Sequence, residues 1–138
     1  LSAETNENIP YYVVEKIVRQ MTRLSKKPRD ISLLCLGVTF KPNVDDLRMS
    51  PALKVMDLLT GYPYRLTYHD PFFPTVELAG RTFRSVKDPY AAAAKATATV
   101  ILSNHRTYDI PRLVKTAPLI IDTRNATRGM RIPSIVKI

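Results

Sequence analysis

The sequence has little of several residue types on which common kinds of site depend. It contains one cysteine, two histidines, four glycines and no tryptophan. A single cysteine cannot form an internal disulfide framework, and with only two histidines no set of metal ligands is predicted. Cys35 lies within the apolar run Ser32 to Leu36. We therefore interpret it as a small core residue, because nucleophilic thiolates need exposed, electropositive surroundings.

Long apolar runs are also missing. No stretch approaches the roughly 20 residues that a transmembrane helix needs. The N-terminal residues Glu4 to Asn8 are polar, unlike the apolar core of a signal peptide. We expect a cytoplasmic protein that does not enter a membrane.

Acidic residues are outnumbered. Lysine and arginine total 21 against 12 acidic residues, which gives a formal net charge of +9. This balance favours an anionic partner and leaves phosphate-bearing metabolites, nucleic acid and membrane surfaces open. At 138 residues and 45% hydrophobic content, the chain is long enough for one domain with a substantial core.

Hydrophobic periodicity predicts alternating helices and strands. Three predicted helices begin at a capping residue followed closely by proline, namely Ser50, Asp88 and Asp109. A first helix is predicted with Asn8 as its cap and an end near Leu24. The remaining predictions are helices at 50–60, 88–96 and 111–115, strands at 32–38, 64–70, 82–86, 99–103 and 119–122, and a single turn at 75–78.

Three of the predicted strands have the apolar sequences expected of buried strands, and each is followed by polar residues. Strands 32–38, 99–103 and 119–122 alternate with helices, which indicates an α/β, Rossmann-like fold. We expect a three-layer architecture, with a parallel sheet and helices on both of its faces. Such a sheet would bring Lys41, His105 and Arg124 to one edge, although they are far apart in sequence.

Two basic residues at that edge suggest an anion site. Arginine offers a planar fork of donors and lysine a mobile point charge, so Lys41 and Arg124 together favour a phosphate or diphosphate. Ordinary surface charge is the alternative interpretation. His69 and His105 are expected to have structural or solvent-facing roles.

The polar loop before Ser50 contains Asp45, Asp46 and Arg48. Paired carboxylates can perform acid–base catalysis, or they can accept backbone N–H groups and hold a loop in shape. We favour the structural interpretation, because the sequence places no third group to separate the pKa values of the two carboxyls. The spaced glycine triplet of a dinucleotide-binding turn is not present in these residues. The ligand is therefore a different phosphate compound, or the chain is a fragment of something larger.

The segment Gly37 to Pro51 reads GVTFKPNVDDLRMSP. It resembles the signature G-x-x-F-K-x-x-x-D-D-x-R-x-S-P in the C-terminal domain of the UDP-glucose/GDP-mannose dehydrogenase family. Residues 69–71 are similar to the Y-D-P of that family, 96–105 to its A-D-A-x-V-I-x-T-x-H segment, and 121–125 to its I-D-x-R-N. Met49 departs from a frequent glutamate, and Ser103-Asn104-His105 replaces Thr-Glu-His. The loop looks closer to the UDP-N-acetylmannosamine type than to the glucose type.

The resemblance implies an NAD-dependent nucleotide-sugar 6-dehydrogenase of polysaccharide biosynthesis. Such enzymes oxidise a C6 alcohol to a carboxylate in two hydride steps, through a thiohemiacetal on a cysteine. The dinucleotide fingerprint and that cysteine belong to regions that would precede Leu1. The resemblance therefore implies that NAD binds mainly outside this chain, and that the chain alone is inactive and carries no catalytic residue.

Residue by residue, the resemblance assigns Phe40 and Lys41 to contacts with the nucleotide sugar and Arg124 to its diphosphate. Asp45, Asp46 and Arg48 match positions of loop architecture. Residues 1–27 would be the tail of a central helix and 28–138 the nucleotide-sugar-binding domain of a homo-oligomeric enzyme. Two alternatives stay open. One is a stand-alone nucleotide-sugar-binding module. The other is a basic nucleic-acid-binding domain, and the lack of a recognition motif in the sequence argues against it.

Overall fold

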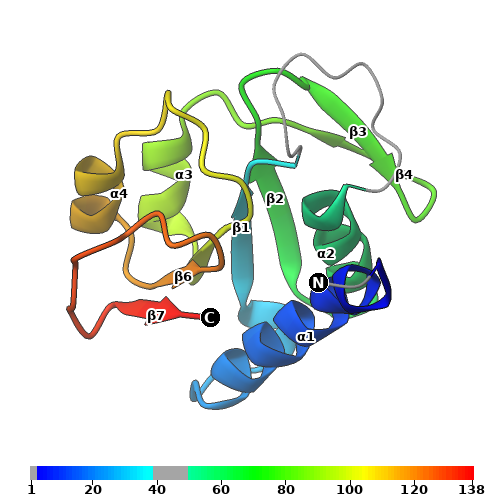
Figure 1. Ribbon diagram of the computed structural model, residues 1–138, viewed down its shortest axis with the longest axis horizontal. Coiled ribbons are helices and arrows are strands. Elements are labelled where there is room, and N and C mark those ends of the chain that lie inside the picture. The colour runs from blue at the N-terminus through cyan, green and yellow to red at the C-terminus, as the bar shows by residue number, and fades with distance from the viewer. Residues whose placement is uncertain (1–2, 39–49) are drawn as a thin grey trace.

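The computed structural model describes residues 3–38 and 50–138. The predicted α/β, three-layer architecture is confirmed: a five-stranded parallel sheet in the order β2-β1-β5-β6-β7 has helices on both faces (Figure 1). The elements are α1 (Ala3–Thr22), the 3-10 turn η1 (Pro28–Asp30), β1 (Ser32–Leu36), α2 (Pro51–Leu59), β2 (Arg65–His69), β3 (Thr75–Leu78), β4 (Arg81–Arg84), α3 (Pro89–Lys95), β5 (Ala98–Ile101), α4 (Ile110–Thr116), β6 (Ile120–Asp122) and β7 (Ile135–Lys137).

The side chains of β1 alternate between two apolar cores, one on each face of the sheet. Leu33 and Cys35 face the core shared with α1 and α2, whereas Leu34 and Leu36 face the core shared with α3 and α4. A strand buried on both faces has this continuous apolar sequence. Figure 1 shows α1 and α2 on one side of the sheet and α3 and α4 on the other. The predicted division of the chain at residue 27 stays a prediction.

The three predicted helix starts are confirmed by their capping hydrogen bonds. The Ser50 hydroxyl accepts from the Leu53 N–H at 3.0 Å, and Asp88 accepts from two backbone N–H groups at the start of α3. Asp109 accepts from the Arg112 N–H at 3.1 Å. Each cap satisfies donors that have no partner within the helix, and the proline that follows fits the first turn.

Two local predictions are wrong. Residues 75–78 form strand β3, which pairs antiparallel with β4, rather than a single turn. Ala79 and Gly80 both have positive φ, 52° and 72°, and they make the two-residue connection. The apolar side chains of this hairpin are buried toward the core on the α2 side, and Figure 1 shows the hairpin above α2. Asn8 is not a cap, because α1 begins at Ala3 and Pro10 lies inside the helix.

Strand β7 has no counterpart in the sequence-based prediction. Its three residues pair in parallel with β6 and form the edge of the sheet.

None of the described helices has the length and apolar character needed to cross a membrane.

Candidate functional site: the carboxyl edge of the sheet

The carboxyl ends of β1, β2, β5 and β6 meet at one edge of the sheet, because all four strands run in the same direction. Polar residues follow each of them, as the sequence predicts. In open α/β sheets, ligands bind outside this edge, near the point where the strand order reverses. Here the reversal lies between β1 and β5.

Several predicted site residues fall outside the described part of the chain, and their placement stays a prediction. These residues are Phe40, Lys41, Asp45, Asp46, Arg48 and the neighbouring Met49. The described ends of this segment are Val38 and Ser50. Of the predicted substrate-binding residues, the structure therefore places Arg124 only.

The end of β1 packs tightly on the end of β5. Gly37 has a φ of +80°, and a Cβ atom there would lie 2.5 Å from the Ser103 Cβ and 2.8 Å from the Ser103 carbonyl oxygen. The backbone N–H groups of Leu102 and Ser103 both donate to the Leu36 carbonyl, at 2.9 and 3.0 Å. Glycine is needed here for the close approach of two strands and for a left-handed conformation.

This packing also bears on dinucleotide binding. In a dinucleotide fold, glycines of the first strand–helix turn let a pyrophosphate approach the backbone. The Cβ position of Gly37 is instead filled by Ser103, and the residues after it do not provide the spaced glycines. The sequence after β1 therefore lacks the glycine fingerprint of a dinucleotide-binding turn.

A buried carboxylate, Asp70, follows β2. Its Oδ1 accepts from the Phe72 N–H at 2.8 Å, and its Oδ2 accepts from the Val38 N–H at 2.9 Å. The same Oδ2 lies 3.2 Å from Nε2 of the buried His105. Burial would raise the pKa of Asp70, but the hydrogen bonds from His105, Phe72 and Val38 outweigh it and lower that pKa. Asp70 was not among the predicted site residues, although the resemblance at 69–71 points to it.

Aromatic and imidazole rings fill the space beside this carboxylate. His69 Nδ1 lies 2.9 Å from the Tyr108 hydroxyl, which donates to the His69 carbonyl oxygen at 3.1 Å. The two contacts are compatible when Nδ1 carries the proton. Burial lowers the pKa of His69 and raises the pKa of Tyr108. The rings of His105 and Tyr108 meet edge to face, and His105 is buried rather than solvent-facing.

A second buried carboxylate shapes the loop after β6. Asp122 Oδ1 accepts from the backbone N–H groups of Arg124 and Ala126, at 3.0 and 3.1 Å. Its Oδ2 accepts from the N–H and the hydroxyl of Thr127, at 2.8 and 2.5 Å. Burial would raise the pKa of Asp122, but these hydrogen bonds lower it. These hydrogen bonds tie the backbone of Arg124 to Asp122, and Arg124 is exposed.

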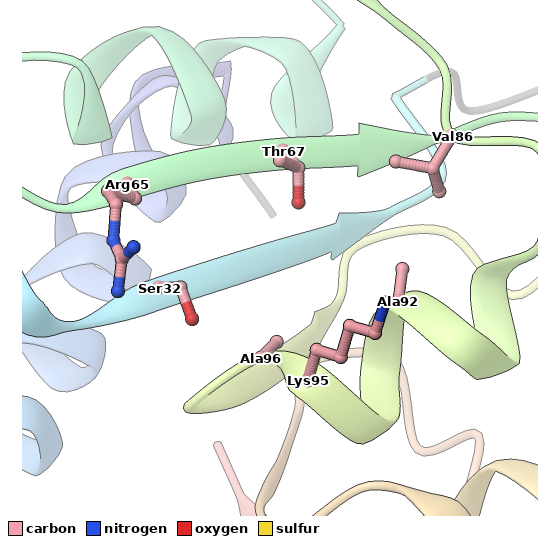
Figure 2. A pocket seen from close by; sticks show the side chains of 7 residues that line it. All are labelled: Ser32, Arg65, Thr67, Val86, Ala92, Lys95 and Ala96. Atoms are coloured by element: carbon pink, nitrogen blue, oxygen red, sulfur yellow. The ribbon is translucent and has the colours of Figure 1, made fainter.

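A separate groove of about 350 Å³ lies between β2 and α3. Figure 2 shows Arg65 of β2 and Lys95 of α3 on opposite sides of it. The hydroxyl groups that line it are engaged elsewhere: Ser32 contacts Thr97, and Thr67 donates to the Leu33 carbonyl. Arg124, the one predicted substrate-binding residue that the structure describes, does not line this groove.

The described residues give little support for a nucleophilic cysteine or for a metal site. Cys35 is fully buried in β1, and burial raises the pKa of its thiol to about 12. A thiol with this pKa is protonated at neutral pH and unreactive. In the ranges 3–38 and 50–138, no group of three histidine, cysteine or acidic side chains is gathered in a way that could hold a metal ion.

The model of the UDP binding domain of the UDP-glucose/GDP-mannose dehydrogenase family matches residues 34–129. The chain belongs to this family. The match runs from β1 through the loop that carries Arg124, so it contains the whole carboxyl edge described above.

Two curated relatives show the same family membership. The chain is 40% identical to a UDP-glucose 6-dehydrogenase of Rhizobium meliloti over 122 residues, which cover 78% of this chain and 28% of the relative. It is 30% identical to a UDP-N-acetyl-D-mannosamine dehydrogenase of Methanococcus vannielii over 132 residues, or 88% of this chain and 29% of the relative. The chain therefore spans less than a third of the length of these relatives.

Solved structures of family members have the same fold. The UDP-N-acetyl-mannosamine dehydrogenase Cap5O of Staphylococcus aureus matches 97% of this chain with a TM-score of 0.69, at 27% identity and 31% of its own length. The UDP-D-ManNAc dehydrogenase of Pyrococcus horikoshii matches with a TM-score of 0.72 at 22% identity, covering 96% of this chain and 31% of that one, a likeness of fold alone.

Proposed function

We propose that this chain is the C-terminal nucleotide-sugar-binding domain of an NAD-dependent UDP-sugar 6-dehydrogenase, of the UDP-N-acetylmannosamine or UDP-glucose type. The observation that carries the proposal is the family match across the carboxyl edge, residues 34–129. The names of the relatives support both substrate types, since both dehydrogenases are among them.

We propose that the UDP diphosphate binds at the carboxyl edge through Arg124 and Lys41, with Phe40 beside the nucleotide sugar. The chemistry of the donors supports this role. A guanidinium can give two parallel hydrogen bonds to a phosphate, and the Asp122 loop fixes the backbone from which Arg124 extends. A rigid support reduces the entropy that binding would otherwise cost.

The reaction that we propose for the whole enzyme is oxidation of the sugar C6 alcohol to a carboxylate. NAD, when bound, accepts the hydrides. The residues of this chain would bind and orient the nucleotide sugar, and its buried Cys35 is not the nucleophile. We therefore expect the 138-residue chain alone to be inactive, and we expect the complete enzyme to be a homo-oligomer.

The test uses the full-length enzyme that contains this chain. Arg124→Ala and Lys41→Ala should each raise the KM for the UDP-sugar about 10- to 100-fold, because one hydrogen bond to a charged group is worth roughly 1.5–3 kcal/mol. The KM for NAD should stay unchanged. Arg131→Ala is the matched control, since Arg131 is also an exposed arginine after β6. Unchanged UDP-sugar kinetics in both site variants would overturn the assignment.

A nucleic-acid-binding role is the second candidate, and the net charge of +9 favours it. It predicts binding to DNA or RNA whose affinity falls steeply with salt, because basic residues would release counterions from the phosphate backbone. A titration of the chain with duplex DNA and single-stranded RNA at two salt concentrations separates the two candidates. Tight, salt-dependent binding that UDP does not displace would favour nucleic acid.

A further inference from the structure

Strand β2 lies at the edge of the sheet, and only one of its faces is well covered. Leu66 and Tyr68 point into the core on the α2 side and are buried. Arg65 and Thr67 alternate with them along the strand, so they face the α3 side, and both are exposed. Helix α3 therefore leaves this face of β2 open, and the groove of about 350 Å³ lies between the two elements (Figure 2).

The helix wall of this groove is built from small side chains. Ala92 and Ala96 line it, together with Val86 from the segment before α3. A methyl group is too short to reach across to β2, so the protein does not fill the space itself. The volume lies at the lower end of the range for small-molecule sites. The groove therefore has room for a small organic molecule against an apolar wall.

Two cations border this space from opposite sides. Arg65 begins β2, and Lys95 lies in the last turn of α3 (Figure 2). Both side chains are exposed, and none of the ion pairs within residues 3–38 and 50–138 involves either of them. Their charges are thus not balanced by a carboxylate of the described chain. Because the hydroxyl groups of the groove are engaged elsewhere, these two charges dominate its polar chemistry.

We propose that the groove between β2 and α3 binds a small organic phosphate, with its phosphate group held by Arg65 and Lys95 and its organic part against Val86 and Ala92. A phosphate monoester carries close to two negative charges at neutral pH, which matches the two cations. The guanidinium can give two parallel hydrogen bonds to it, and the ammonium adds a point charge. The site does not include Arg124 and does not rest on the proposed function.

A titration of the 138-residue chain with phenyl phosphate tests the inference, because this probe joins a phosphate dianion to an apolar ring. Binding is followed in ¹⁵N–¹H NMR spectra, and we expect the amide signals of residues 65–67 and 92–96 to shift. Arg65→Ala and Lys95→Ala should each weaken binding about tenfold, the order expected when a hydrogen bond to a charged group is lost. No binding at millimolar concentrations, or unchanged affinity in both variants, would overturn the inference.

The chain offers a matched control for each cation. Lys115 is an exposed lysine in the last turn of α4, as Lys95 is in α3, and it does not line the groove. Arg84 is an exposed arginine on β4, also away from the groove. Lys115→Ala and Arg84→Ala should bind phenyl phosphate like the parent chain. Equal losses in the controls and in the groove variants would show attraction to the overall positive charge and would reject the site.

Two further measurements separate the groove from a pair of surface charges. Ala92→Leu keeps both cations but fills the apolar wall, so it should weaken the binding of phenyl phosphate about tenfold; unchanged affinity would reject the groove as the site. Benzoate has the same ring with a single negative charge and should bind about tenfold more weakly. Equal affinity for benzoate would overturn the assignment of a phosphate ligand.

The outcome is independent of the carboxyl edge. Arg124→Ala should leave the binding of phenyl phosphate unaltered. Shifts confined to residues 122–128 that disappear in Arg124→Ala would overturn the inference about the groove, although they would support the proposed function. Failure of the UDP-sugar kinetics to respond to Arg124→Ala would count against the proposed function and leave the groove unaffected.

Discussion

Replacing Asp122 by asparagine should destabilise the protein strongly, although the two side chains have nearly the same shape. Asp122 is only 1% exposed, and its two oxygens accept four hydrogen bonds. Two donors point at each oxygen. Turned one way, the asparagine NH₂ group would face the N–H groups of Arg124 and Ala126. Turned the other way, it would face the Thr127 N–H, while the Thr127 hydroxyl could rotate to accept from it, so at least one buried hydrogen bond would be lost.

The size of the effect follows from these contacts. A hydrogen bond to a charged group contributes roughly 1.5–3 kcal/mol, so the loss of one such bond, with a buried N–H left facing the amide, gives about 3 kcal/mol. For a chain of this length, 1 kcal/mol shifts the unfolding temperature by about 4 °C, so we expect a fall of about 12 °C.

The assay is thermal unfolding of the 138-residue chain, followed by circular dichroism at pH 7. Asp88→Asn is the control, because in the described residues only its Oδ1 accepts, from the N–H groups of Tyr90 and Ala91. The asparagine oxygen can take over both contacts, so its transition should move by less than about 2 °C. Equal small shifts in Asp122→Asn and Asp88→Asn would refute the reasoning about the loop.

Two further predictions concern the carboxyl edge. Gly37→Ala should destabilise the chain by at least about 3 kcal/mol, because it adds a steric clash to a left-handed φ. Gly80→Ala should cost only about 1 kcal/mol, because Gly80 has a φ of +72° but open space around it. Equal urea midpoints for the two variants would contradict this prediction. Stability should also decline as the pH falls below about 6.5, because burial lowers the pKa of His69 and the unfolded chain then binds more protons. A second decline should follow below about pH 4, as Asp122, whose native pKa is lowered, is protonated; urea titrations at several pH values check both, and a pH-independent midpoint would disprove them.

Much of the fold could be predicted from sequence because its signals are local. Ser50, Asp88 and Asp109 are each followed closely by proline, and each one caps a helix in the structure. The apolar run at 32–36 is a strand buried on both faces. These signals depend on hydrogen bonds and burial within a few residues, so they can be read without knowledge of the tertiary contacts.

Other features depend on contacts between distant residues, and the sequence did not predict them. Strand β3 has four residues and is defined by its pairing with β4; the positive φ at Ala79 is not a signal that an alanine carries. Strand β7 has three residues and exists through its pairing with β6. Pro10 suggested a helix start, because proline fits the first turn of a helix, but α1 begins at Ala3 and contains Pro10 in its interior.

The candidate site could be predicted only in part, because some of its contacts join residues that are distant in sequence. Arg124 was identified from its position after an apolar strand and from the family motif. The contact between Asp70 and Val38 was not predicted, although the resemblance at 69–71 points to Asp70, because a hydrogen bond between residues 32 apart leaves no periodic or compositional signal. For His105 the sequence left a structural and a solvent-facing role open; its side chain is buried and lies 3.2 Å from Asp70, a contact that the sequence did not predict.

Photochemical cross-linking tests the central claim most directly. A photoreactive UDP-glucose analogue would be cross-linked to the full-length enzyme, and the labelled peptides would be mapped by mass spectrometry with excess UDP as competitor. We predict UDP-sensitive labelling within residues 36–50 and 122–128, at the carboxyl edge. Labelling confined to the groove at Arg65 and Lys95, or to peptides outside this chain, would contradict the account.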